Sequence, residues 1–502
     1  MMGKLFDKTW REEKGIALIF VSFSIFVVLG ITAFATDLAW FYLNASRAQR
    51  TADAAALGGV VWMPSDFYQA SATAQDVAKR NGFDEAAPNV TVTPSIVAGE
   101  ASQLEVTVQK DIRTFFLKVL GFDSVTVTRS ARAEYIPPLR LGSPSNQFGN
   151  DPSCYASDPD CAGNFWANIH GRNTDTRMGD AYSSYCFDGV GSVNGCKVNP
   201  SYRDTGYLYG VIPNANSVSV QTLDMNFHYE DSVLNGDPHR TGDHNNFCGK
   251  YPTCVGPTVE VNVFYPDPTP LDVSNNTLYC SETYTPQPQV NPDDDPPFNP
   301  AVWLWDTVCN GSINTSSSPD GIWVVQIKLL GNNVNTSGLN RYSIKSSVGN
   351  LFALGDFSIY NNAAGTTTSF HLAEVPDFYA GKTFVVEMYD PGEAVDDGTL
   401  QVVDPSGAIW DDNGCRIYTR DEVTDSWSLS QTINPGSNCE ELVNPGEYNG
   451  QWLKFEIDLP GTYSCASDCW WKMNYAYKSP VNDTTTWRAY MVGNPIHLVP
   501  LP

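Results

Sequence analysis

The sequence predicts an α+β protein that is mostly β. An N-terminal transmembrane helix continues into a small α+β unit, and two β-sandwich (jelly-roll-like) blocks follow. Three observations predict this. Residues 15–35 form an almost unbroken apolar run, residues 37–59 keep a helical spacing of small side chains, and short alternating segments separated by Gly, Pro, Asn and Asp dominate after residue 138. The 502 residues leave room for about two to four domains.

The first element is the apolar run GIALIFVSFSIFVVLGITAFA, whose length of about 20 residues matches the hydrocarbon core of a bilayer when helical. The tail before it carries four basic residues, and the positive-inside tendency places that tail in the cytoplasm. We therefore expect a cytoplasmic tail at 1–14, a transmembrane helix at 15–36 and an extracytoplasmic remainder. The basic residues are Lys4, Lys8, Arg11 and Lys14, and the expected anchor residues are Gly15, Ile16, Leu18, Phe20, Phe23, Phe26, Leu29 and Phe34.

The alternative to an anchor is a cleaved secretory signal, because Ala33-Phe34-Ala35 has the small-x-small form of a cleavage site. Ordinary signal cores span about 7–15 residues. This run is longer, and the chain after it keeps helical periodicity instead of starting a turn-rich domain. Both properties favour an anchor.

A stripe of mostly small residues continues the helix beyond the apolar run. Its members lie three and four apart and so share one helix face: Leu38, Phe41, Ala45, Ala48, Ala52, Ala55 and Gly59. Small side chains let another backbone approach closely, as at packed helix interfaces. Two interpretations stay open: the stripe packs on the chain's own globular part, or it packs on a partner helix.

The same segment resembles the N-terminal region of TadE/TadG-like proteins of the tight-adherence (Flp) pilus machinery. The residues that carry the resemblance are Glu13-Lys14-Gly15, Asp37-Leu38-Ala39 with Tyr42-Leu43, Arg47-Ala48-Gln49, and Ala52-Asp53-Ala54-Ala55-Ala56-Leu57. The resemblance is strong over about the first 60 residues and weaker to about Ile136. It implies a bacterial membrane protein with a part in pilus assembly.

Processed pilin-like members carry a Glu a few residues after a Gly cleavage point. Here Phe20 lies at the fifth position after Gly15. The resemblance therefore favours an uncleaved anchor of the TadG sort.

Residues 37–138 are expected to form the long helix and a small α+β head. A helix should begin at Ser65 or Asp66, which are good N-caps, and end at Asn81-Gly82. The segments 90–96, 104–113 and 123–136 alternate like strands, and 115–121 (FFLKVLG) is typical of a short apolar helix. Pro137-Pro138 then marks a linker.

Two disulfide-containing β-sandwiches are expected after the linker, at 139–350 and 351–502, and two interpretations stay open: the blocks are separate sandwiches, or they share strands. The first block should contain strands at 165–171, 206–212, 217–227, 258–265, 321–330 and 341–347, and the second at 354–362, 367–375, 382–390, 398–404, 452–459, 469–477 and 485–493. Residues 285–300 are rich in Pro and Asp, which indicates a solvated loop.

All twelve cysteines lie in these two blocks. An even number confined to the exported region indicates disulfides. The short separations favour local pairs: Cys154 with Cys161, Cys186 with Cys196, Cys248 with Cys254, Cys280 with Cys309, Cys415 with Cys439, and Cys465 with Cys469. The alternative for the last pair is half of a metal site, although the histidines nearest in sequence supply no second half.

The sequence lacks the common catalytic motifs, and its six histidines are scattered. We therefore expect no enzyme activity, no resident cofactor and no metal. Weaker alternatives are a metal at His239 and His244 or Ca²⁺ at Asp293-Asp294-Asp295 or Asp411-Asp412-Asn413, which supply oxygen ligands without the spaced EF-hand pattern.

The net charge of −26 repels phosphate backbones and argues against a nucleic-acid partner. The expected partners are the membrane and pilus-assembly or envelope proteins, and the expected role is structural. A second hypothesis is a surface adhesin or carbohydrate-binding protein. In it Trp303 and Trp305, which share one face of a strand, stack on a sugar ring, whereas the alternative for both is core packing.

Overall fold

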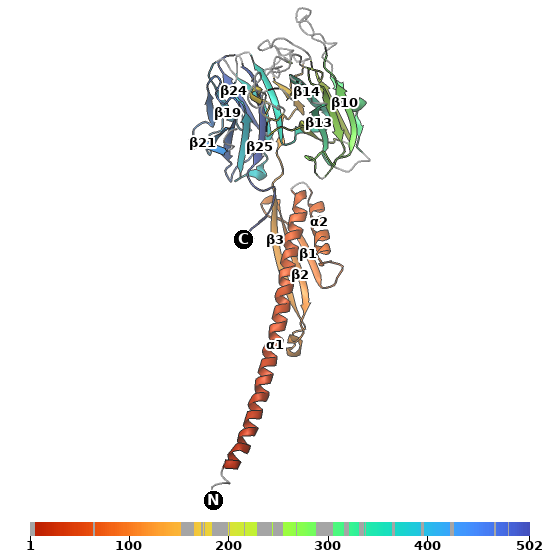
Figure 1. Cartoon of the computed structure of the whole chain (residues 1–502), viewed down its shortest axis with the longest axis vertical. Coiled ribbons are helices and arrows are strands. Elements are labelled where there is room, and N and C mark those ends of the chain that lie inside the picture. The colour runs from red at the N-terminus through yellow and green to blue at the C-terminus, as the bar shows by residue number, and fades with distance from the viewer. Residues whose placement is uncertain are drawn as a thin grey trace, which may run out of the picture. The chain divides into compact units, whose positions relative to one another are not determined.

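The computed structural model divides the chain into two compact units (Figure 1): unit 1 is Met1–Pro137 with Gly493–Pro502, and unit 2 is Pro138–Val492. The residues that the structure describes are 6–63, 66–151, 165–171, 174, 176–182, 199, 201–214, 216–227, 243, 255–267, 269–287, 305–315, 321–330, 336, 338–363, 367–392, 396–421, 426–465, 468–479 and 481–501.

Unit 1 begins with the helix α1, Phe6–Gly59, which runs through the apolar segment and the small-residue stripe without a break. A short 3-10 turn, Val60–Trp62, leads to α2, Phe67–Arg80. Asp66 caps α2 by accepting a hydrogen bond from the Gln69 N–H at 2.9 Å. Gly82, with φ at +86°, follows the end of α2. The predicted bounds of this helix are confirmed.

An antiparallel sheet completes unit 1, in the order β1-β2-β3-β26. The strands are β1 Val90–Val97, β2 Glu100–Arg113, β3 Ser124–Tyr135 and β26 Ile496–Val499, and a 3-10 turn, η2 Leu117–Leu120, lies between β2 and β3. The first three match the predicted strands, because their side chains alternate between core and solvent. The sequence did not predict β26, which joins β3 from the far end of the chain.

Unit 2 is built from two large antiparallel sheets. One has the order β10-β9-β13-β7-β15-β4-β17-β24-β19-β22 and the other β11-β8-β14-β6-β16-β25-β18-β23-β20-β21, with β12 and β5 attached to β8 and β14. The strands are β4 Arg140–Leu141, β5 Gln147–Phe148, β6 Phe165–His170, β7 Tyr207–Ile212, β8 Ser217–Leu223, β9 Val259–Phe264, β10 Leu278–Tyr284, β11 Asp306–Thr307, β12 Ile313–Asn314, β13 Trp323–Leu329, β14 Leu339–Val348, β15 Asn350–Ala353, β16 Asp356–Ala363, β17 Thr368–Glu374, β18 Thr383–Tyr389, β19 Gly398–Val403, β20 Cys415–Asp421, β21 Ser426–Ile433, β22 Glu440–Val443, β23 Gln451–Asp458, β24 Trp470–Tyr477 and β25 Val481–Met491.

Aromatic side chains fill the space between the two sheets. The ring of Trp487 on β25 contacts that of Phe370 on β17 at a centroid distance of 4.8 Å, and Tyr209 on β7 shares a 2.9 Å hydrogen bond with Tyr342 on β14. Trp487, Tyr209 and Tyr342 are fully buried. This arrangement confirms the predicted mostly-β class after a long N-terminal helix.

Both sheets run across residue 350, where the sequence interpretation placed a boundary between two sandwiches. Figure 1 shows a group of strands that includes β10 and β13 beside a group that includes β19, β24 and β25. The early strand β4 joins these groups in one sheet by pairing with both β15 and β17, and β6 joins them in the other by pairing with β14 and β16. Residues 493–502, assigned to the second block, belong to unit 1. Alternating segments predict strands but not which strands pair over long separations.

Candidate functional site: the apolar helix and the head packed on it

The N-terminal part of α1 presents its apolar side chains to the outside of the unit. Ile16, Leu18, Phe20, Phe23, Phe26, Leu29 and Phe34 are each more than half exposed. The segment is long and apolar enough to cross a membrane, and its most apolar window has no part buried. A soluble core helix with the same composition would instead bury one face. The exposure of Gly15 is not among the described properties of the helix.

The stripe farther along α1 packs on the chain's own head. Ala45, Ala48, Ala52 and Ala55 are buried in one cluster with alanines of α2 and with branched side chains of the sheet. Phe41 packs partly against this cluster, whereas Leu38, nearer the apolar run, stays 55% exposed. The stripe therefore serves intramolecular packing over most of its length.

Gly59 lies where α1 approaches its neighbours closely. A Cβ atom there would lie 2.6 Å from the Ala70 carbonyl oxygen and 2.7 Å from Leu104 Cδ2. Only a residue without a side chain fits at this distance from α2 and β2, so this member of the stripe is required by close approach.

Asp37, at the end of the apolar run, joins α1 to the connection between β2 and β3. Its carboxylate accepts hydrogen bonds from the backbone N–H groups of Phe115, Phe116 and Leu117 at 2.8, 2.9 and 2.7 Å. Burial would raise the pKa of the Asp37 carboxyl, but the three donors outweigh it, and the pKa lies below its ordinary value. Asp37 therefore holds this connection as an ionised residue.

The sequence pointed to Asp37 within the family motif without giving it a role. One signal was present in the sequence: the segment FFLKVLGF between two predicted strands is apolar, although connections between strands are normally polar. That signal could have indicated that another part of the chain holds this connection. The structure forms only the short 3-10 turn η2 there.

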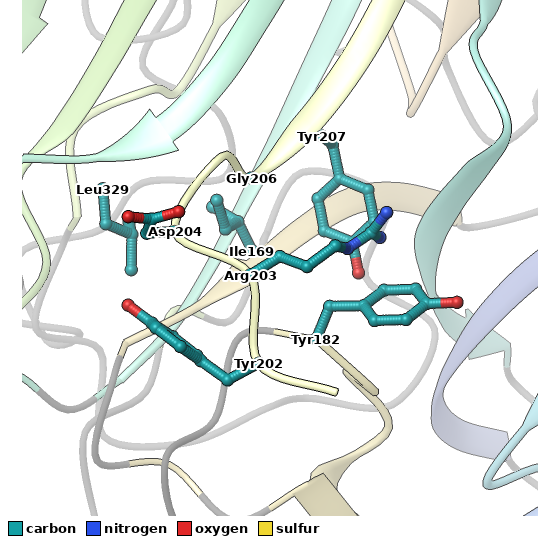
Figure 2. Close-up of a pocket in the computed structure, with 8 residues that line it drawn as sticks. All are labelled: Ile169, Tyr182, Tyr202, Arg203, Asp204, Gly206, Tyr207 and Leu329. Carbon is teal, nitrogen blue, oxygen red and sulfur yellow. The ribbon is translucent and has the colours of Figure 1, made fainter. Parts of the chain in front are cut away.

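Unit 2 contains a cluster of charged and aromatic side chains around Arg203 (Figure 2). The Arg203 guanidinium donates to Asp356 Oδ1 at 2.8 Å and lies 3.5 Å from the centre of the Tyr182 ring. The Tyr207 hydroxyl donates to Asp180 Oδ1 at 2.7 Å. Burial is the main cause that raises the pKa of Tyr182 to about 12.

The cavity beside these residues has a volume of about 10 Å³, which is about the space of one water molecule. Arg203 binds Asp356, and Tyr207 binds Asp180 beside them, so the arrangement is a partly buried ion-pair and aromatic cluster of the β unit.

His170 is a fully buried side chain in the same unit. Neither of its ring nitrogens has a hydrogen-bond partner in the part of the chain that the structure describes. Burial, together with the positive charge of Arg341, lowers the pKa of His170 well below its ordinary value, so the ring is neutral.

Three of the predicted disulfides are formed: Cys280–Cys309, Cys415–Cys439 and Cys465–Cys469. The first ties together the two ends of the acidic, Pro-rich segment, as predicted.

The other three predicted disulfides fall on cysteines that lie outside the described residues, so their pairing stays a prediction. These pairs are Cys154 with Cys161, Cys186 with Cys196, and Cys248 with Cys254.

Among the described residues, one group of potential metal ligands comes together, namely Asp377 with Cys465 and Cys469. The disulfide between the two cysteines takes up both sulfur atoms, which leaves no thiolate for a metal. Asp411, Asp412 and Asn413 form an exposed turn in which the Asn413 amide donates to the Asp458 carbonyl. The other candidate ligands, His239, His244 and residues 293–295, lie outside the described residues.

Trp305 is partly buried, and Lys345 Nζ lies 3.8 Å from the centre of its ring. It also packs against a buried cluster of Trp166, Leu223 and Tyr360. A sugar ring could not stack on the face that Lys345 covers. Trp303 lies outside the described residues, so the glycan contact stays a prediction.

Comparison with known families identifies the N-terminal region. Residues 15–72 match a family described as putative Flp pilus-assembly TadE/G-like. The matched range contains the exposed apolar segment, Asp37, the packed stripe and the start of α2, and it confirms the resemblance of this region to TadE/TadG-like proteins. No curated protein matches the chain. The N-terminal region therefore associates the chain with a membrane and with Flp pilus assembly.

Proposed function

We propose that this chain is a bacterial single-pass membrane protein that acts as a structural component in Flp pilus assembly or in display at the cell surface. The observation that carries the proposal is the family match at residues 15–72, which includes most of the continuous helix α1 with its two distinct parts. The first part exposes large apolar side chains, as a helix in lipid does, and the second buries small ones against a folded head.

The proposed orientation has the N-terminal tail in the cytoplasm and both folded units outside. The basic residues before the apolar run support it through the positive-inside tendency. The three disulfides of unit 2 also support it, because such bonds persist in oxidising compartments.

In this proposal the protein has no catalytic activity and no resident cofactor. A weaker alternative to the absence of a cofactor is a Ca²⁺ ion bound at the 411–413 turn. Its partners are the membrane and other pilus-assembly or envelope proteins. The acidic composition of the chain suits a soluble extracytoplasmic surface and does not suit nucleic acid.

The test is complementation in a strain that lacks this chain. We expect loss of the chain to abolish pili and the wild-type protein to restore them. The double variant Phe26→Arg with Leu29→Arg should leave the membrane fraction and fail to restore pili, since each Arg at a helix centre opposes insertion by about 3 kcal/mol. The volume-matched control Phe26→Leu with Leu29→Phe keeps the span apolar and should restore them.

Normal pili in the absence of the chain would contradict the proposed role in pilus assembly. If, in addition, the purified protein bound glycans and Trp303→Ala weakened that binding, the adhesin hypothesis would replace it. Steady turnover of a glycan or peptide panel by the purified protein would contradict the non-catalytic part.

A further inference from the structure

The connection between β2 and β3, residues 114–123, exposes an unusual number of large apolar side chains. We call it the β2–β3 loop. Its exposed members are Phe115 (50%), Phe116 (49%), Val119 (82%), Leu120 (73%) and Phe122 (61%). Scattered apolar residues are normal on protein surfaces, but a contiguous apolar patch of this kind marks an interaction site.

The loop is fixed against α1 at a defined height. Asp37 accepts the three backbone N–H groups described above, and the Trp40 ring contacts that of Phe115 at a centroid distance of 5.6 Å. Phe34 of the apolar run and Leu117 of the loop line one cavity of about 150 Å³. Figure 1 shows this end of β2 and β3 lying alongside α1.

That height coincides with the end of the apolar run. A helix rises about 1.5 Å per residue, so a span that enters lipid at Ile16 reaches the opposite hydrocarbon boundary after about 30 Å, close to Ala35. Asp37 lies about 3 Å beyond it. The loop is therefore level with the headgroup region and the upper part of the acyl chains.

The neighbouring side chains suit that environment. Exposed Tyr42 and partly buried Trp40 are aromatic residues of the type that gathers at membrane interfaces. Lys118 lies within the loop and Arg113 at its base, and both are exposed. Basic groups at this depth can reach lipid phosphates while their stems stay in apolar surroundings.

We propose that the β2–β3 loop inserts into the lipid interface of the membrane that α1 crosses, as a second membrane contact beside the span. The apolar surface of the loop continues that of the helix, and lipid covers both. Two contacts at one boundary fix the rotation and tilt of α1, which a single helix leaves free. This inference rests on the proposed membrane anchoring of α1.

The test uses the full-length protein in lipid nanodiscs, with an environment-sensitive fluorophore on an introduced cysteine. Val119→Cys places the probe in the loop. Tyr68→Cys is the matched control, because Tyr68 is equally exposed at 80% and lies at the start of α2. The start of α2 contacts α1 near Gly59, and Gly59 lies about 33 Å beyond Asp37 along α1. The control probe is therefore about that far from the level of the loop.

We expect the emission of the probe at position 119 to shift to shorter wavelength in nanodiscs and to be quenched by lipids brominated in the upper acyl chain. The probe at position 68 should show neither change. Equal, water-like emission at both positions would overturn the inference. Protection of position 119 in native membranes but not in pure lipid would also overturn it, because the loop would then contact a protein.

Co-flotation of the same labelled protein with lipid vesicles tests the anchor separately. If the protein floats but the probe in the loop is not quenched, the anchor is present and the loop contact is refuted. Protein that does not float refutes the anchor itself.

Discussion

Close packing of α1 on α2 and β2 predicts that glycines on one helix differ sharply in their tolerance of a methyl group. At Gly59 an added Cβ would lie 2.6 Å from a backbone oxygen, which cannot move without displacing α2. At Gly58 the nearest atom is Val77 Cγ2 at 2.9 Å, the end of a side chain. At Gly30 nothing lies within 4 Å. The three positions therefore form a graded series on one element.

The expected magnitude for Gly59→Ala combines two effects. Overpacking in a closely packed site costs about 1–3 kcal/mol. Replacing Gly by Ala in a helix returns up to about 1 kcal/mol. Because the clash is with backbone, we expect a net loss of about 2 kcal/mol from the free energy of unfolding of unit 1. Gly58→Ala should lose less than half of that, and Gly30→Ala nothing.

Native-state hydrogen exchange of the full-length protein in nanodiscs measures this series. Amides of β2 that exchange through unfolding of unit 1 should exchange about 30-fold faster in Gly59→Ala than in the wild type, since 1.4 kcal/mol corresponds to a factor of ten. The packing described here would be refuted if β2 amides of Gly59→Ala exchanged at the wild-type rate, or if Gly58→Ala accelerated their exchange more than Gly59→Ala does.

Three further predictions concern other parts of the molecule. Replacing Cys415 and Cys439 together by Ser should lower the free energy of unfolding of unit 2 by about 3 kcal/mol in urea titrations, from the length of the loop that the disulfide closes; an unchanged midpoint would contradict this. Asp37→Ala should speed amide exchange across 114–123 while leaving β2 amides unchanged, and undiminished protection of the loop would show that Asp37 does not hold it. His170 is neutral in the folded state and its pKa is lowered, so stability is complete above the unfolded pKa of about 6.5 and falls as the pH drops below it. His170→Phe should reduce that acid-induced loss, measured as urea midpoints at neutral and acidic pH, and an identical loss in the variant would exclude His170 as a cause.

The helical part of the chain could be predicted from sequence because its signals are local. Apolar length predicts the span, three-and-four spacing predicts the stripe, and a side-chain cap with a following glycine bounds α2. Asp66 and Gly82 play the predicted roles. The strands of the head follow from alternation, which depends on neighbours two residues apart.

The rest depends on contacts that the local pattern does not encode. The pairing of β26 with β3 joins residues 496–499 to the N-terminal unit. β6 joins β14 to β16, which lie on opposite sides of residue 350, and β4, from residues 140–141, pairs with β15 and β17, which start at residue 350 or later. The role of Asp37 likewise depends on backbone donors about 80 residues away. Sequence therefore predicted that 115–121 is apolar and short, but not that Asp37 holds it at the end of the span.

The most direct test of the whole account is the accessibility, from outside the cell, of one site before the span and one site in unit 2. A protease added to intact spheroplasts should remove an epitope inserted at the exposed Ser406-Gly407 turn and spare one fused at Met1, and it should cut both after the membrane is permeabilised. We expect this result if the helix at residues 15–36 stays in the membrane and unit 2 lies outside. Loss of the Met1 epitope from the mature chain, or protection of the 406–407 epitope in intact spheroplasts, would contradict it.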